Sequence, residues 1–291
     1  MITRTFSQQK TIRNPLKRTD VFRCAHAAHR DFDFAVSAYH VLKEKQCFPD
    51  GCMDFKWHCR SLKRNKKCHR GYTNPGKKCD GCNELIEDKI QRTPKIMVSA
   101  KNYVEFTEQL VDFQNFLDSV KGKKVIINGL LSSVKPMIIG NGTPEGRKFT
   151  GFLLTLKEGF IGFDRIEDTI YARVGSEQQQ LNKFRPGDKV EFKGYIFIDR
   201  GRMVLKKIGA VTVFERGEGY IWETAKARVA AQSGIFLENK PRKCRRCPMG
   251  LLVDGDNSGC SNGRRIFCMQ GIENPEECVF DIYDKYLTNG D

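Results

Sequence analysis

Cysteine and histidine side chains, the usual thiolate and imidazole ligands of metal ions, are gathered in two segments of the sequence. All five histidines and seven of the twelve cysteines lie between Cys24 and Cys82, and the other five cysteines lie between Cys244 and Cys278. A C-x2-C pair on a tight turn places two sulfurs at adjacent corners of a metal tetrahedron, which a second pair completes. Each segment contains one such pair, so each is predicted to be a small metal-binding module.

The carboxy-terminal segment has the spacing C-x2-C-x12-C-x7-C-x9-C. Cys244 and Cys247 form its pair, and Cys260 and Cys268 are the expected completing ligands. Cys278 is either a substitute for one of them or a spare buried thiol, and free core cysteines are the alternative for the whole group. The segment is too short and too rich in loops to bury a sufficient core, so we expect it to fold only with metal.

The amino-terminal segment has more candidate ligands than one tetrahedral site needs. Its thiols are Cys24, Cys47, Cys52, Cys59, Cys68, Cys79 and Cys82. Cys79 and Cys82 form the C-x2-C pair, with Cys59 and Cys68 as their nearest partners. Cys47 and Cys52 could join Cys24 and a nearby histidine in a second site. Two metals are therefore favoured over one metal or one cluster. The chain is expected to hold two or three Zn2+ ions, with a [4Fe-4S] cluster as the alternative, because both accept four thiolates from such spacings.

The histidines are weaker candidates, and His26, His29 and His40 are each expected to be surface or core residues. A run of basic residues without a single acid overlaps the same segment. Its members are Lys56, Arg60, Lys63, Arg64, Lys66, Lys67, Arg70, Lys77 and Lys78, with Trp57 and Tyr72 inside the run and Phe55 just before it. Basic side chains on a metal-braced loop can contact phosphates while aromatic rings stack on exposed bases. The alternative is that the aromatic residues form the small core of the module.

The overall charge agrees with a polyanionic partner. The formal net charge is +15, and residues 1–100 hold 21 Lys and Arg against 10 Asp and Glu. A field of this sign favours nucleic acid, although a basic surface kept for solubility is the simpler alternative. No secretory signal or run of eighteen apolar residues is present, which predicts an intracellular protein (cytoplasmic, or nuclear in a eukaryote) without a membrane partner. In a reducing compartment the cysteines are expected to bind metal instead of forming disulfides.

The elements that must position these residues follow from the apolar periodicity. Apolar residues at three- and four-residue spacing predict an amphipathic helix over 103–120, and a second helix is expected over 220–236. Between them the period becomes strand-like in five segments, 123–134, 148–163, 169–174, 188–205 and 206–214. The expected modules are a basic Cys/His-rich module at 1–95, a bridging helix at 96–122, a β-barrel at 123–218, and a helix with a metal module at 219–291.

Five strands with a polar insert between the third and fourth resemble an OB fold. The resemblance is carried by Pro186-Gly187-Asp188 opening the fourth strand, Gly194 within it, and Arg200-Gly201-Arg202 at the following turn. It implies a mixed, mainly β protein, in which a five-stranded OB-type barrel with flanking helices lies between two small modules that resemble zinc ribbons or Fe–S modules. It also implies that strands two and three offer a face to a single strand. The candidate contacts there are Lys148, Phe152, Lys157, Phe160, Phe163, Arg165, Tyr171, Arg173, Arg200 and Arg202.

The sequence has none of the common catalytic signatures. It lacks a Walker P-loop, the zinc-deaminase motif, HExxH, GxSxG and the dinucleotide-binding glycine pattern. Glu191-Phe192-Lys193 has a faint likeness to the acid and lysine of a nuclease, but alternating charges are ordinary on a strand. We therefore expect a non-catalytic binder of single-stranded or structured DNA or RNA. The alternatives are an iron–sulfur redox or sensor protein, and a structural adaptor in a larger nucleoprotein assembly.

Overall fold

The computed structural model describes residues 10–139, 146–238, 243–244, 247–253 and 265–278. The chain divides into two compact units, one of Pro15–Leu110 and the other of Met1–Asn14 with Val111–Asp291. Helix α2 (Ala100–Val120) matches the helix predicted over 103–120 and runs through the boundary between them. Within the described residues, no helix combines the length and the apolar character needed to cross a bilayer.

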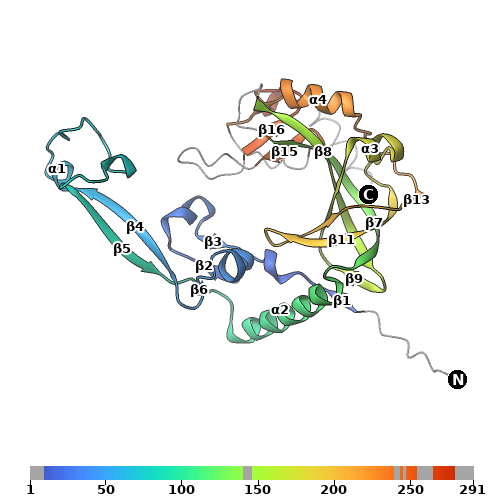
Figure 1. The fold of residues 1–291 in the computed structure, drawn as a ribbon, viewed down its shortest axis with the longest axis horizontal. Helices are drawn as coiled ribbons and strands as arrows, with labels where there is room; N and C mark the ends of the chain where they lie inside the picture. Colours follow the sequence, from blue (N-terminus) through green and yellow to red (C-terminus); the bar gives the residue numbers. More distant parts are fainter. Residues whose placement is uncertain (1–9, 140–145, 239–242, 245–246, 254–264, 279–291) are drawn as a thin grey trace. The chain divides into compact units, whose positions relative to one another are not determined.

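A closed barrel of five strands forms the centre of the larger unit (Figure 1). Its strands are β7 (Lys124–Ile139), β8 (Lys148–Ile161), β10 (Ile170–Val174), β11 (Lys189–Asp199) and β12 (Arg202–Lys206). Around the barrel they follow the order β7, β8, β10, β12, β11 and back to β7. β10 and β12 are parallel, and the other four pairs are antiparallel. The protein is therefore mainly β with few helices.

Strand β11 shows why these segments form a barrel. Side chains on a strand alternate between its two faces, so a strand with one buried face shows period-two burial. Val190 and Phe192 are buried, whereas Lys189 is exposed and Glu191 is half-buried. This confirms the prediction that the two apolar residues do not share a face with the two charged ones.

Gly194 in the same strand has no room for a side chain. A Cβ atom there would lie 3.0 Å from both Leu205 Cδ1 and the Lys206 carbonyl oxygen of the neighbouring strand β12. This confirms the prediction that Gly194 lies in a barrel strand where a side chain would collide with a neighbour.

The prediction was wrong about the last two barrel strands. Residues 188–205 form two strands, β11 and β12, because the chain reverses at Arg200 and Gly201, which have φ angles of 51° and 78°. The expected fifth segment forms only β13 (Val211–Glu215), which pairs with β11 outside the ring. The fifth barrel strand is β12, since its pairing with β10 buries Met203 and Leu205 completely.

Short elements extend the barrel. β9 (Asp164–Ile166) pairs with β8, and β1 (Thr11–Ile12) pairs with β9. Helix α3 (Ser176–Asn182) lies between β10 and β11 in the chain, and α4 (Thr224–Ser233), within the helix expected over 220–236, packs against β8.

A small antiparallel sheet lies near the carboxy-terminal end of the described residues. Its strand order is β14 (Ile235–Phe236), β16 (Arg265–Cys268) and β15 (Gly250–Val253). A short 3-10 helix, η6 (Pro275–Glu277), follows it. β15 contacts the barrel strand β7.

The smaller unit consists of a compact core and a long hairpin. The core holds the sheet β3 (Ala35–Val36), β2 (Phe22–Arg23) and β6 (Lys95–Ile96), with the short helices η1 (Pro15–Lys17), η2 (Ala27–Phe32) and η3 (His40–Glu44). The hairpin pairs β4 (Cys52–Cys59) with β5 (Leu85–Arg92), and α1 (Arg60–Lys63) and η4 (Lys77–Cys79) lie between them in the chain.

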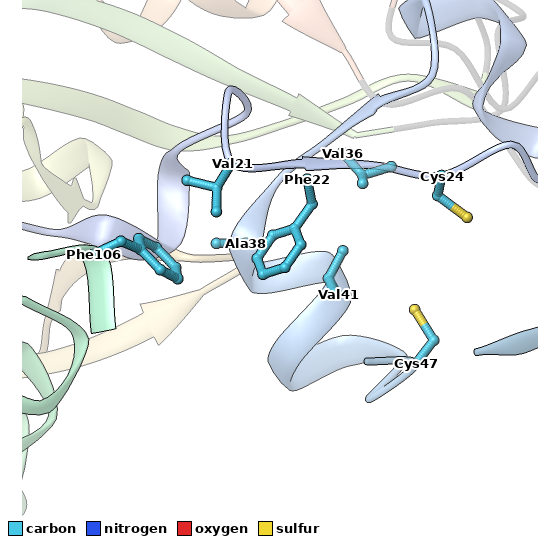
Figure 2. Packing of buried hydrophobic residues seen from close by; sticks show 8 residues of the cluster. All are labelled: Val21, Phe22, Cys24, Val36, Ala38, Val41, Cys47 and Phe106. Atoms are coloured by element: carbon cyan, nitrogen blue, oxygen red, sulfur yellow. The ribbon is translucent and has the colours of Figure 1, made fainter. Parts of the chain in front are cut away.

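Phe22 is the centre of the core of the smaller unit. It is fully buried among Val21, Val36, Ala38, Val41 and Phe106, as Figure 2 shows. Cys24 and Cys47 belong to the same buried cluster, and Cys52 packs against it. The hydrophobic core thus holds three cysteines close to one another.

Candidate metal centres and nucleic-acid interface

Four cysteines gather where the β4–β5 hairpin ends. Cys59 is the last residue of β4, and Cys68, Cys79 and Cys82 follow in the connection to β5. All four line one small cavity of about 10 Å3. The backbone N–H of Arg70 donates to Cys68 Sγ at 3.4 Å. We name these four residues the hairpin thiol group.

A second set of four thiols lies beside the carboxy-terminal sheet. Burial raises the pKa of the Cys244 thiol, and the thiols of Cys247, Cys268 and Cys278 raise it further because they lie close by. Burial also raises the pKa of Cys247, while the N–H of Met249 donates to its sulfur at 3.4 Å. We name these four cysteines the carboxy-terminal thiol group.

One of the two cysteines expected to complete this group, Cys268, is described. Cys260 was expected to complete the site, but it lies outside the described residues. Cys278, the expected substitute, is among the thiols that act on Cys244.

A third set contains three thiols. Cys24 and Cys47 are almost fully buried, and the thiol of Cys52 is hydrogen-bonded to both of their sulfurs. Burial, followed by the charges of Cys24 and Cys47, raises the pKa of Cys52 to about 11. We name these three cysteines the core thiol group.

The three groups contain the ligand types of metal sites, but their side chains are not arranged around a common point. Among the described residues, no three His, Cys, Asp or Glu side chains are arranged so that they could hold an ion as they stand. The donor set nevertheless fits a thiophilic ion, because a divalent cation stabilises cysteine thiolates as its ligands.

The histidines of the smaller unit mostly have partners of their own. His26 Nδ1 accepts from the N–H of Ala28, and His40 Nδ1 lies 2.9 Å from Glu44 Oε2. His58 Nε2 lies 2.9 Å from Asp88 Oδ2, and His69 lines the hairpin cavity. Burial, with the nearby His40 and His26, lowers the pKa of His29 to about 4, so its imidazole is neutral at physiological pH.

The nine basic residues of the acid-free run are all exposed. Trp57, for which base stacking and a place in the core of the module are the alternatives, is 36% exposed on the hairpin, where its indole N–H donates to Glu87 Oε1 at 3.4 Å. Met53 and Phe55 are also exposed and, at every second position, lie on the same face of β4 as Trp57. Tyr72 is half-buried and lines the cavity of the hairpin thiol group.

The barrel displays a row of side chains on its outer face. Tyr171 on β10 is opposite Thr155 on β8 and Val204 on β12, and Val204 is opposite Phe197 on β11. Phe197 is 42% exposed, and Tyr171 is half-buried. The two rings are two strands apart, which is roughly 10 Å at the usual strand spacing.

A cation covers each of these two rings. The guanidinium of Arg202 lies 5.6 Å from the centroid of Tyr171, and Lys206 Nζ lies 5.0 Å from the centroid of Phe197. Arg173, two residues after Tyr171, pairs with Asp199. We name Tyr171, Phe197, Arg202 and Lys206 the barrel face.

Sequence reasoning found only part of the barrel face. It included Tyr171 and Arg202, but missed Phe197 and Lys206. The alternation of side chains along β11 predicts that Phe197 faces outward, because it is an even number of residues from the outward-facing Lys189 and Lys193.

Other candidates occupy different places. Phe152 is fully buried in the barrel, so its ring is not available for stacking, because alternation turns it to the interior. Lys148 and Arg200 are exposed, and Phe163 is 82% exposed beside the β8–β9 turn. In comparisons with known proteins, no family model, no curated protein and no solved structure matches the chain.

Proposed function

We propose that the chain is a non-catalytic protein that binds single-stranded nucleic acid across the barrel face. The observation that carries the proposal is the pair of aromatic rings, each beside a cation, on the two strands that flank β12 on one barrel surface. Bases stack on aromatic rings and on guanidinium planes, and cations beside the rings can contact phosphates.

The barrel also supports an OB-type assignment. A five-stranded ring in which the third and fifth strands are parallel neighbours, with a helix between the third and fourth, is the arrangement of an OB barrel. In such a barrel β8 and β10 correspond to strands two and three, and the β11–β12 turn borders the binding face. Arg200 and Arg202 lie at this turn.

The exposed basic run provides a second, less specific surface. Nine cations without an acid among them raise the local concentration of a polyanion and add phosphate contacts. We propose that metal ions held by the cysteine-rich modules brace this surface. The barrel face and the basic run are argued independently, since they belong to different units.

The test of the barrel face is a pair of matched double variants. Binding of a fluorescein-labelled oligothymidylate is measured by fluorescence anisotropy at low salt. Phe197→Ala with Lys206→Gln removes one ring and its cation, which should weaken binding roughly 5- to 150-fold, since one stacked base contributes about 1–3 kcal/mol. The control, Phe214→Ala with Lys189→Gln, removes an exposed ring and a cation from elsewhere on the barrel and should bind as the parent does.

Two results would contradict the proposal. Equal binding by the two double variants would mean that the nucleic acid does not contact the barrel face. No binding by the parent protein, even at low salt, would remove nucleic acid as the partner and leave a protein–protein adaptor as the explanation of the basic surface.

A further inference from the structure

The cysteines of the described residues separate into three groups without sharing a member. Eleven cysteines are described, none is in a disulfide, and the groups contain four, four and three of them. Three or four neighbouring thiols without a disulfide are a donor set that suits a thiophilic metal ion.

The cavity of the hairpin thiol group limits what it can hold. Its volume of about 10 Å3 is close to the space of a single water-sized sphere. One zinc ion with four thiolate ligands at about 2.3 Å suits a space of this kind, whereas a four-iron cluster brings eight heavy atoms. The geometry therefore favours a mononuclear site over a cluster.

Backbone contacts bring the first three members of the carboxy-terminal thiol group together. Gly250 pairs with Cys268, and a Cβ atom on Gly250 would lie only 1.8 Å from the carbonyl oxygen of Cys244. The N–H of Gly250 also donates to the carbonyl of Cys247 at 3.0 Å. Gly250, which pairs with Cys268, is thus in direct contact with both Cys244 and Cys247.

An ion pair brings the fourth member to the same place. Lys243 Nζ lies 3.5 Å from Glu276 Oε2, and these residues precede Cys244 by one position and Cys278 by two. The helix η6 is therefore held beside the C-x2-C pair, with Cys278 at its end.

We infer that the chain holds three separate mononuclear sites for a thiophilic divalent ion of the zinc class, formed by the hairpin, carboxy-terminal and core thiol groups. Cys278, and not Cys260, completes the carboxy-terminal site. The core site has three thiolates, so its fourth ligand is not one of the described cysteines. This inference does not depend on the proposed function, because it concerns metal content and not nucleic-acid binding.

The first test uses the unmodified protein. It is purified without added metal, and its metal and acid-labile sulfide are measured; the expected result is about three zinc equivalents per chain and no sulfide. Cysteines are then alkylated under native conditions before and after chelation, and their modification is located by peptide mass spectrometry. The eleven grouped cysteines should become markedly more reactive after chelation, whereas Cys260 should react equally in both states.

The second test assigns each ion to its group. Cys79→Ser with Cys82→Ser, Cys244→Ser with Cys278→Ser, and Cys24→Ser with Cys52→Ser should each lower the zinc content by about one equivalent. Cys260→Ser is the matched control and should keep all three. If a double variant does not fold, the alkylation pattern of the unmodified protein still decides the grouping.

Several results would overturn the inference. Iron with acid-labile sulfide would replace the mononuclear sites with clusters. Protection of Cys260 by metal, together with free reaction of Cys278, would reverse the assignment of the carboxy-terminal site. Two zinc equivalents, with Cys24, Cys47 and Cys52 unaffected by chelation, would make the core thiol group an ordinary part of the hydrophobic core.

Discussion

Asp188 shows how one residue determines the local geometry of the barrel. Its carboxylate is fully buried and accepts from the N–H of Arg185 at 3.1 Å and of Gly217 at 2.9 Å. The guanidinium of Arg216 lies 3.4 Å away. These contacts join the turn before β11 to the segment after β13, which explains why an acid stands in the Pro-Gly-Asp motif that the sequence singled out.

We predict that Asp188→Ala lowers the free energy of unfolding of the larger unit by roughly 2–4 kcal/mol, because it leaves two buried N–H groups without their charged acceptor. The measurement is urea unfolding followed by the fluorescence of the buried Trp222, in a Trp57→Phe background that leaves only this tryptophan. The exposed Glu218→Ala is the control and should change stability by less than about 0.5 kcal/mol. A similar midpoint for both variants would contradict the structural role of Asp188.

At the scale of elements, two cations of the barrel hold the carboxy-terminal sheet. Lys135 of β7 donates to the carbonyl oxygens of Cys247 at 2.8 Å and Gly250 at 2.6 Å. Arg147 donates to the carbonyl of Gly234 at 2.6 Å, and its guanidinium lies about 5 Å from the ring centroids of Phe236 and Phe267. Burial lowers the pKa of Lys135, as expected for an ammonium group covered by the sheet.

We predict that Lys135→Met detaches β15 from β7, since the variant keeps the apolar stem but removes the ammonium group that donates to both carbonyl oxygens. Amide hydrogen exchange across β15 and β16 should become at least several-fold faster, corresponding to a loss of about 1–3 kcal/mol. Lys193→Met, on the exposed face of β11, should leave this exchange unchanged. Unchanged exchange in Lys135→Met would mean that the sheet is held mainly by Arg147 and the aromatic rings.

At the scale of the whole molecule, the surplus positive charge predicts how binding responds to salt. Neutralised phosphates release counterions, so the logarithm of affinity falls with the logarithm of salt by about 0.7 per contact for single strands. Lys63, Arg64, Lys66 and Lys67 are exposed near the end of the hairpin. Charge reversal of these four should make the salt slope shallower by about 2 to 3 without changing the metal content.

Two comparisons make the prediction specific. Charge reversal of the equally exposed Lys101, Lys121, Lys123 and Lys124 lowers the net charge by the same amount and should alter the slope much less. Trp57→Ala should lower the affinity with little change in slope, since stacking displaces few ions. An identical slope in the hairpin variant and the parent would leave the barrel face as the only contact surface.

The sequence alone predicted features that depend on local patterns. Period-two burial is a property of each strand, so the barrel segments and the inward side of Val190 and Phe192 could be predicted. The helix at α2 followed from its three- and four-residue spacing in the same way. The positions of the thiols, the acid-free basic run and the Pro-Gly-Asp turn are also local, and each was identified without knowledge of the fold.

Only the tertiary structure decided which residues meet. Spacing suggested the two amino-terminal groups, but it left open whether Cys278 joins Cys244, which lies 34 positions before it. The barrel face likewise depends on the register of three strands, which brings Tyr171 and Phe197 into one row. Strand β12 was included in the same segment as β11, although a turn was expected at Arg200-Gly201-Arg202, because apolar residues continue on both sides of that turn. Pairing across long loops is set by the packing of the whole core, which no single segment of the sequence contains.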